Sequence, residues 1–286
     1  MPMQKPPAPS PNASPAGRHI ALLIDADNVS HTKIAGILSE LSKYGTPNIR
    51  RAYGDWTSKQ LSGWQGKLHE FAIRPIQQFS YSTGKNATDI SLVIDAMELL
   101  YTQRLDGFAI ASSDADFTPL VMHLRAASHE VYGFGERKTP EPFVNACTTF
   151  LYLDTLGSET GDVVAAGDKP GQRKAPAKPG NPAKPAAASK PAPAATPVRA
   201  LAQDAKLVAT LRLAVQAVAR DDGWALLATA GSAAKRQAPI DPRNYGAKNF
   251  PALFEATGLF EIVKGTENQA FVADKRNADR TAKPTE

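Results

Sequence analysis

The sequence contains a single cysteine, Cys147, and this scarcity excludes two classes of protein. One thiol cannot form an intramolecular disulfide framework, and it cannot supply a Cys-rich zinc site. Because Cys147 lies in a run of mixed apolar and polar residues, we expect it to pack rather than to react. The five histidines are scattered along the chain, which makes them weak candidates for a catalytic group.

The sequence also lacks a long hydrophobic run. None of its apolar stretches approaches the length of about 18 residues that a membrane-spanning helix requires. The first 17 residues carry six prolines and no apolar segment of the kind that directs export. These absences predict a soluble, cytoplasmic protein with no membrane partner.

The chain has a net charge of +5, and this charge is unevenly distributed. Residues 18–155 hold 13 Lys and Arg against 15 Asp and Glu, whereas residues 156–200 hold 7 against 3. The excess positive charge therefore lies mainly in a connecting segment. Such a segment is suited to remain near an anionic polymer, and a purely solubilising linker explains the same charge equally well.

Composition divides the chain into two domains. Residues 158–200 are rich in Ala, Pro and Lys and have almost nothing to bury, so we expect an extended, disordered linker. A disordered tail is expected at 1–17 and another at 276–286. The folded parts are then an N-terminal domain at 18–157 and a C-terminal domain at 201–275.

The N-terminal domain alternates strand patterns with helix patterns, which predicts an α/β fold with a doubly wound, mostly parallel sheet. The first strand, "IALLI", is continuously apolar, as expected for a strand that is buried on both faces. Strands are expected at 20–24, 48–56, 73–80, 107–112, 130–136 and 151–154. Helices are expected at 31–45, 58–72, 88–103, 117–128 and 140–150.

Carboxylates follow two of these strands in the same pattern. Asp25 and Asp27 come after the first strand, Asp114 and Asp116 come after the fourth, and Asp89 lies in the first turn of the intervening helix. Functional residues of such sheets gather at the carboxyl ends of strands, near the point where the strand order reverses. If the first and fourth strands are neighbours, these acidic side chains meet at one edge.

Acidic groups brought so close together raise each other's pKa or require a cation. Hard oxygen ligands select Mg²⁺ or Mn²⁺ over zinc, and such a metal can activate water and stabilise charge on phosphorus. The pattern therefore indicates phosphodiester hydrolysis. Each acid also has a structural explanation, since Asp89 can complement a helix dipole and the other four can cap helices or turns.

Three segments, "LLIDADNV", "ATDISLVIDA" and "IASSDADFTPLV", occur in an order that resembles the NYN domains of the PIN-like nuclease superfamily, particularly the LabA-like branch. The resemblance covers residues 18–155 and implies a ribonuclease that uses one or two Mg²⁺ or Mn²⁺ ions. It implies catalytic, metal-binding roles for four aspartates and supporting roles for neighbouring polar groups. The metal ligands are Asp25, Asp89, Asp114 and Asp116, and the supporting residues are Asn28, Ser112 and Ser113.

Two further aspartates are expected to act from outside the metal site. Asp27 lies where many relatives carry other small residues, so its substitution should matter least among the four acids after the strands. Asp95 lies about 240° around the helix from Asp89 and is expected to support or pack. Lys85, Trp56 and Tyr81 are candidates for RNA contact because they lie in or beside loops beyond strand ends.

The C-terminal region has the order helix, helix, helix, hairpin, which is typical of a winged-helix α+β domain. Residues 204–274 resemble the OST-HTH, or LOTUS, domain at Trp224, Leu227, Asp241, Tyr245, Gly246, Leu253, Phe254 and Phe260. That resemblance implies RNA binding or protein partners. The candidate phosphate contacts beside the third helix are Lys235, Arg236, Arg243 and Lys248, and a solvated basic surface is the competing explanation.

The sequence thus predicts a metal-dependent ribonuclease domain tethered to an RNA-binding winged-helix module, and it leaves open a homo-oligomer. A first alternative is a non-catalytic RNA-binding or scaffold protein. A second is a phosphatase of the haloacid-dehalogenase kind, because "DAD" after a first strand is also the opening motif of that class. The phosphatase also needs a preceding lysine motif, which this sequence does not convincingly supply.

Overall fold

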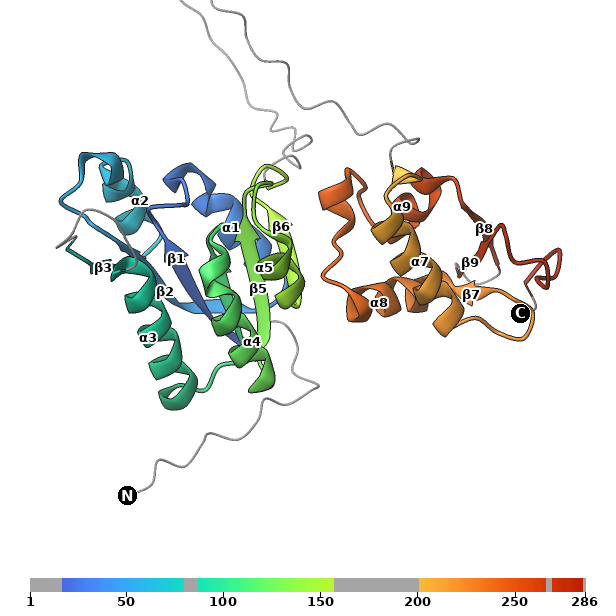
Figure 1. Cartoon of the computed structure of the whole chain (residues 1–286), viewed down its shortest axis with the longest axis horizontal. Coiled ribbons are helices and arrows are strands. Elements are labelled where there is room, and N and C mark those ends of the chain that lie inside the picture. The colour runs from blue at the N-terminus through green and yellow to red at the C-terminus, as the bar shows by residue number, and fades with distance from the viewer. Residues whose placement is uncertain (1–16, 80–86, 157–200, 266–268, 285–286) are drawn as a thin grey trace, which may run out of the picture.

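The computed structural model describes residues 17–79, 87–156, 201–265 and 269–284, which form two folded domains (Figure 1). The predicted linker, and all but the last residue of the predicted N-terminal tail, lie outside these ranges. The predicted α/β domain and the small C-terminal domain are both present. In the described residues no helix is long and apolar enough to cross a membrane.

The N-terminal domain is built on a six-stranded sheet with the order β3-β2-β1-β4-β5-β6. All five strand pairs are parallel, which confirms the predicted doubly wound sheet. The strand order reverses between β1 and β4, so the two acid-bearing strands are neighbours. The strands are β1 (His19–Asp25), β2 (Thr46–Gly54), β3 (Arg74–Gln77), β4 (Gly107–Ala111), β5 (Glu130–Gly135) and β6 (Thr149–Tyr152).

Helices cover both faces of this sheet, which is why its central strands read as apolar runs. Along β1, Ile20, Leu22 and Ile24 join one hydrophobic cluster, while Ala21 and Leu23 join the other. The first cluster is covered by α1 (Ile34–Leu41) and α2 (Trp64–Glu70). The second is covered by α3 (Ala87–Thr102), α4 (Thr118–Ala126) and α5 (Glu141–Ala146).

The expected helices are present, but two of them start differently and the helix expected at 140–150 ends at residue 146, because Thr149 and Phe150 already belong to β6. The helix expected from residue 31 begins with a 3-10 turn, η2 (His31–Lys33), before α1. The helix expected at 58–72 is divided into the 3-10 turn η3 (Lys59–Leu61) and α2. In both turns a serine before the first residue accepts a backbone hydrogen bond, which favours a tight turn over a full α-helical start.

The C-terminal domain has the predicted order of helices and hairpin. Its elements are α7 (Ala205–Ala217), β7 (Ala225–Leu226), α8 (Leu227–Gln237), the 3-10 turn η5 (Pro242–Tyr245), α9 (Phe250–Thr257), β8 (Phe260–Lys264) and β9 (Ala270–Asp274). The sheet has the antiparallel order β7-β9-β8. Polar residues cap the starts of α7 and α9, since Asp204 and Asn249 each accept a backbone N–H from the first turn.

The C-terminal domain extends beyond the expected boundary at residue 275. The buried indole of Trp224 donates through Nε1 to the Thr281 carbonyl at 3.0 Å. The guanidinium of Arg280 donates to Glu261 at 2.7 Å. Residues 276–284, which lie in the expected C-terminal tail, therefore contact the domain, and Thr281 supplies the acceptor for the buried Trp224 donor.

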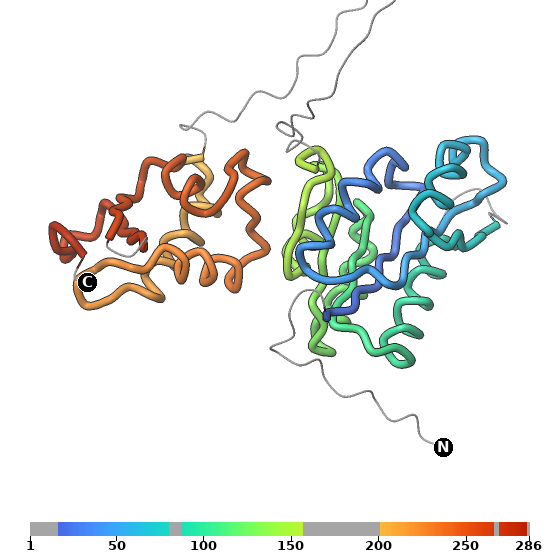
Figure 2. The backbone as a smooth tube through the Cα atoms, turned by 180° about the vertical axis from the view of Figure 1, so that it is seen from behind, coloured from blue at the N-terminus to red at the C-terminus, as the bar shows by residue number. Residues whose placement is uncertain are grey.

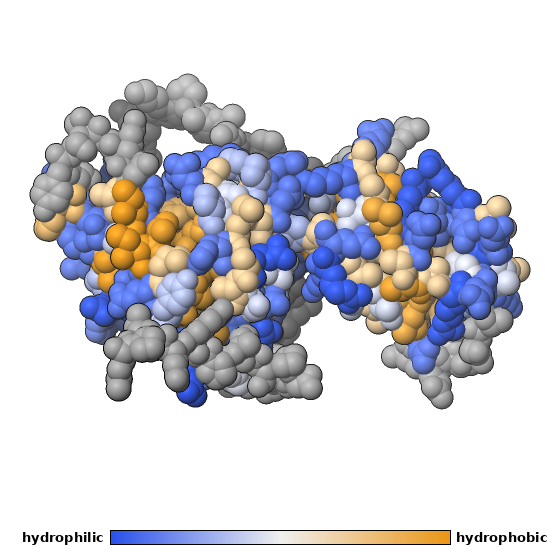
Figure 3. Space-filling model, turned by 60° about the horizontal axis from the view of Figure 1, so that its bottom comes forward, coloured by the Kyte–Doolittle hydropathy of each residue, from blue (hydrophilic) through white to orange (hydrophobic). Residues whose placement is uncertain are grey.

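The two domains meet along one side of the sheet. In Figure 2 the yellow-green edge of the N-terminal domain faces the orange η5 region, and the Asn244 side chain donates to the Phe150 carbonyl of β6 at 2.7 Å. A different surface carries apolar side chains in the open. Ile90, Ile94 and Tyr101 of α3 and Met122 of α4 are exposed, and Figure 3 shows hydrophobic residues gathered on the face of this domain.

Candidate active site

The parallel pairing of the central strands β1 and β4 places the predicted site at the carboxyl-terminal edge of the sheet, where both strands end. Ile24 pairs with Ala111, so Asp25 and Ser112 follow at the same level on neighbouring strands. The Ser112 hydroxyl donates to Oδ2 of Asp25 at 2.8 Å, although the two residues are 87 positions apart in the chain. The reversal of strand order, where ligands bind in such sheets, therefore coincides with the acidic residues.

Asp25 is held rigidly and is almost fully buried, with 1% of its surface exposed. Its Oδ2 also accepts from Nδ2 of Asn28 at 2.7 Å, and its Oδ1 accepts from the Asn28 backbone at 3.3 Å. Burial raises the pKa of Asp25 above the ordinary 3.8, and the hydrogen bonds from Asn28 and Ser112 offset only part of that increase. Oδ1 keeps the greater capacity for a further partner.

The second acidic pair follows β4 and shapes its own turn. Oδ1 of Asp114 accepts the Asp116 N–H at 2.8 Å, which caps the 3-10 turn η4 (Ala115–Phe117). The Ser112 hydroxyl accepts the Asp114 N–H at 3.1 Å, so one serine connects the two strand ends. Asp114 is half-buried and Asp116 is exposed, which leaves both carboxylates accessible to a ligand.

The third contribution comes from the start of α3. Burial, followed by repulsion from Asp25, Asp114, Asp116 and Asp27, raises the pKa of Asp89 to about 6. Repulsion from all four acids shows that the fold gathers five carboxylates at this edge. We call Asp25, Asp27, Asp89, Asp114 and Asp116 the acid cluster.

Asp27 has a structural role that the sequence did not indicate. Its Oδ2 accepts from the Thr88 hydroxyl at 3.1 Å, which ties the loop after β1 to the start of α3. Thr88 is the residue that sequence reasoning missed. Its position directly before Asp89 was the available signal.

The donors of the acid cluster are oxygens only, which suits a hard divalent cation. Within the described residues, no three His, Cys, Asp or Glu side chains converge closely enough to hold a metal ion. The oxygen donors of the acid cluster fit a hard divalent cation, but their side chains lie farther apart than the ligands of a formed metal site.

Two predicted supporting residues have other partners. Ser113 accepts the Glu136 N–H at 2.8 Å and thereby fixes the loop after β4 to the end of β5. Asp95 forms an ion pair with Arg51 at 2.7 Å and accepts from the Tyr53 hydroxyl at 2.6 Å. These contacts join α3 to β2. Arg51 is therefore paired with Asp95.

The aromatic candidates of this domain are mostly packed. Trp56 is half-buried, its Nε1 donates to the Ile76 carbonyl at 3.0 Å, and its ring meets Trp64 edge-on with centroids 6.2 Å apart. Trp56 does lie just beyond β2, at the same edge as the acid cluster. Lys85 and Tyr81 lie outside the described residues.

The basic candidates of the C-terminal domain fall into two groups. Lys235, Arg236 and Lys248 are exposed, and the Lys235 ammonium lies 5.8 Å from the centre of the Phe250 ring. Arg243 is half-buried between Asp241 of its own domain and Glu40 of the N-terminal domain. Its guanidinium faces two carboxylates instead of an open surface.

Comparison with known proteins identifies both halves of the chain. Residues 19–154 match the NYN domain, and residues 200–271 match the OST-HTH/LOTUS domain. One solved structure, of a protein of unknown function from Vibrio parahaemolyticus, is 18% identical, with a TM-score of 0.41 over 49% of this chain and 95% of that one. The comparison with curated proteins gave no match. NYN domains are PIN-like nuclease domains and OST-HTH domains are RNA-binding modules, and this chain carries one of each.

Proposed function

We propose that the protein is a metal-dependent endoribonuclease whose C-terminal domain retains the RNA. The acid cluster is the observation that carries this proposal. Five carboxylates lie at the strand-order reversal, where burial first and then repulsion from the other four acids raise the pKa of Asp89 to about 6. Acidic clusters with perturbed pKa values in folded proteins are typical of functional sites. A bound cation relieves this repulsion.

In this proposal Asp25, Asp89, Asp114 and Asp116 hold Mg²⁺ or Mn²⁺. The cation, when bound, supplies an activated water and stabilises negative charge on the phosphorus. The remaining residues orient the ligands. Asn28 and Ser112 fix the Asp25 carboxylate, and Asp27 fixes the start of α3 through Thr88. Ser113 secures the loop that carries Asp114.

The C-terminal domain contributes affinity through exposed cations. Lys235 and Arg236 in the last turn of α8 and Lys248 just before α9 are solvent-exposed, and Lys235 also lines a cavity between the two helices. Contacts of this kind neutralise phosphates, so binding should weaken as the salt concentration rises. Trp56 and the two candidates outside the described residues, Lys85 and Tyr81, are proposed to meet RNA at the N-terminal domain.

Cleavage of labelled single-stranded and structured RNA, with Mn²⁺, Mg²⁺ or EDTA, tests the proposed function. Wild-type protein should cleave with either metal and should stop in EDTA, and Asp114→Asn should be inactive. Asp106→Asn is the matched control, because Asp106 lies before the opposite end of β4 and its contact to the His19 N–H suits an amide oxygen equally well. Cleavage that survives both EDTA and Asp114→Asn would remove the metal mechanism.

Two further measurements on the same protein separate the alternative functions. Tight RNA binding without cleavage under any metal would support a scaffold protein. Release of phosphate from a small ester would support the phosphatase, which needs Asp25 as a covalent nucleophile. The structure disfavours that role, since Asp25 is 1% exposed and its Oδ2 already accepts two hydrogen bonds.

A further inference from the structure

Arg243 makes the densest polar contact between the two domains. Its Nε donates to Asp241 Oδ1 at 2.8 Å, and its second terminal nitrogen donates to Asp241 Oδ2 at 2.8 Å and to Glu40 Oε1 at 2.7 Å. Its first terminal nitrogen donates to Glu40 Oε2. One guanidinium thus bridges a carboxylate of each domain, and the planar donors of arginine match this bidentate arrangement.

Glu40 lies at the end of α1, and its side chain is 4% exposed with the two domains in contact. Within its own domain its ionic partner is Lys43, at 2.9 Å, whose side chain is 50% exposed. Burial alone would raise the pKa of Glu40, but the hydrogen bonds from Arg243 and Lys43 outweigh it and hold the pKa below the ordinary value. A buried carboxylate that depends on an arginine of another domain marks a specific contact.

Asn244 makes an independent contact beside the first. Strand β6 is at the edge of the sheet, so one side of its backbone lacks a neighbouring strand. Nδ2 of Asn244 donates to the Phe150 carbonyl at 2.7 Å, and its Oδ1 accepts the Tyr152 N–H at 3.2 Å. The amide side chain therefore pairs with β6 as a short strand would, and it blocks that edge.

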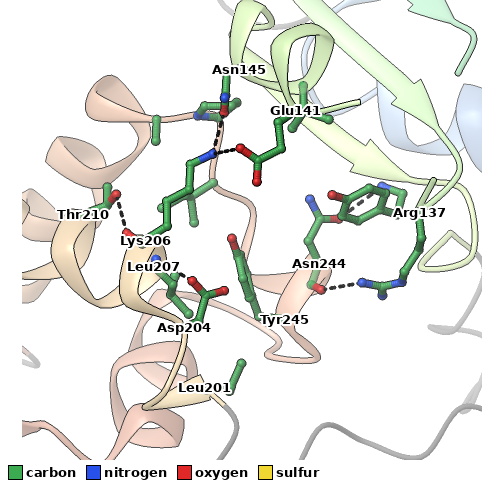
Figure 4. A pocket seen from close by; sticks show the side chains of 15 residues that line it. Arg137, Glu141, Asn145, Leu201, Asp204, Lys206, Leu207, Thr210, Asn244 and Tyr245 are labelled. Carbon is green, nitrogen blue, oxygen red and sulfur yellow. Dashed lines mark hydrogen bonds and ion pairs between the residues drawn. The ribbon is translucent and has the colours of Figure 1, made fainter. Parts of the chain in front are cut away.

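A third set of contacts lies across a cavity from Asn244. Lys206 of α7 donates to Glu141 at 3.0 Å and to Asn145 at 3.2 Å, both on α5 (Figure 4). The Lys206 and Glu141 side chains are 58% and 78% exposed, so this pair contributes little energy. The cavity, of about 410 Å³, separates it from Asn244 and Arg137. The contact between domains thus depends mainly on the η5 side.

We propose that Glu40 and the open edge of β6 form a docking site for the chain's own OST-HTH domain, with Arg243 and Asn244 as its specificity residues. We call Glu40, Arg243, Asn244 and the open edge of β6 the interdomain clamp. The clamp gives Arg243 a structural partner in place of a phosphate, and it leaves Lys235, Arg236 and Lys248 free for RNA. It sets the orientation of those cations relative to the acid cluster. The proposal is independent of whether the acid cluster cleaves RNA.

Amide hydrogen exchange of the full chain tests the clamp at the Tyr152 N–H, whose partner is Asn244. This amide should be protected in the wild type and should exchange at least about 10-fold faster in Asn244→Ala and Arg243→Ala. Glu40→Gln weakens the Arg243 contact from the N-terminal domain, and it should also make the Tyr152 amide exchange faster. That variant keeps the proposal testable if Arg243→Ala perturbs the fold of η5.

Lys206→Ala is the matched control, because it removes an interdomain cation of the weak, exposed pair. It should leave Tyr152 protected. X-ray scattering of the same full-length proteins should show a larger radius of gyration for Arg243→Ala and an unchanged one for Lys206→Ala. Equal Tyr152 exchange in the wild type and all three clamp variants, or a wild-type scattering profile of independently moving domains, would overturn the proposal.

Discussion

The acid cluster and the interdomain clamp each bury a carboxylate, Asp25 in the cluster and Glu40 in the clamp, and the pKa shifts in the two regions have opposite directions. The cluster contains five negative groups at one sheet edge, and the pKa of Asp25 and Asp89 is raised. In the clamp Arg243 lies between Glu40 and Asp241, and the pKa of each carboxyl is lowered although burial alone would raise it.

The difference separates a buried carboxylate that has a counter-ion from one that lies among like charges. A carboxylate with its counter-ion already in place is stabilised in its charged form and has little to gain from a ligand. A carboxylate among like charges retains an unmet demand for a cation. The direction of the pKa shift therefore distinguishes the two regions where residue type and burial do not.

The largest expected effect is loss of cleavage when one cluster acid loses its charge. Substitution of residues that only orient metal ligands typically costs roughly 10- to 100-fold, so Asp114→Asn should lower the cleavage rate by more than about 100-fold. Asp27→Asn should have the smallest effect of the cluster acids, because an amide oxygen can still accept from Thr88. Initial rates on one labelled RNA measure both, and equal losses would contradict the ranking.

Glu40→Gln should lower the free energy of unfolding of the N-terminal domain. The variant weakens charge-assisted hydrogen bonds from Arg243 and Lys43, and such bonds contribute about 2 kcal/mol. The cost is limited, since an undocked domain can return this side chain to water. Urea unfolding at pH 7 measures the change, and an unchanged midpoint would show that Glu40 does not need its partner.

Asp89→Asn should change the free energy of unfolding in the opposite direction from Glu40→Gln. It should raise that free energy at pH 7 by about 1 kcal/mol after solvent screening is allowed for. The pKa of Asp89 is about 6 in the folded protein against an ordinary 3.8. A raised pKa means that the folded state holds the proton more tightly, so this stabilisation is full below pH 3.8 and is lost as the pH rises through 6.

The wild type should therefore lose stability relative to Asp89→Asn between pH 4 and pH 6, and the two proteins should converge below pH 4. Thermal unfolding at a series of pH values, without added divalent metal, gives the comparison. Destabilisation by Asp89→Asn at pH 7 would show that its helix-dipole contribution outweighs the repulsion within the cluster.

The smallest effect is expected at the exposed pair of Lys206 and Glu141. Lys206→Ala should change the free energy of unfolding by less than about 0.5 kcal/mol, because exposed ion pairs are screened and cost side-chain entropy. This small change in the free energy of unfolding should also vary little with salt concentration. If Lys206→Ala lowered the free energy of unfolding as much as Glu40→Gln does, the main contact between the domains would be this pair and not the clamp.

Much of the N-terminal fold was accessible from sequence because its patterns are local. The continuous apolar run at Ile20–Ile24 predicted a strand buried on both faces, whereas the neighbour relation of β1 and β4 and their register came only with the folded sheet. The helix at Ala87–Thr102 was readable from apolar spacing. The two 3-10 turns were not, because serine capping competes with helix formation only over a few residues.

The sequence by itself determined which chemistry the chain can carry: acidic residues after two strands and at one helix start, and a second domain with basic residues. Tertiary structure alone decided which charges are compensated. Arg243 and Glu40 are 203 positions apart, and no periodicity links them. Ser112 and Asp25 are joined over 87 positions because two parallel strands end at the same level. Electrostatic partners depend on distances through space, and those exist only once the domains have folded and met.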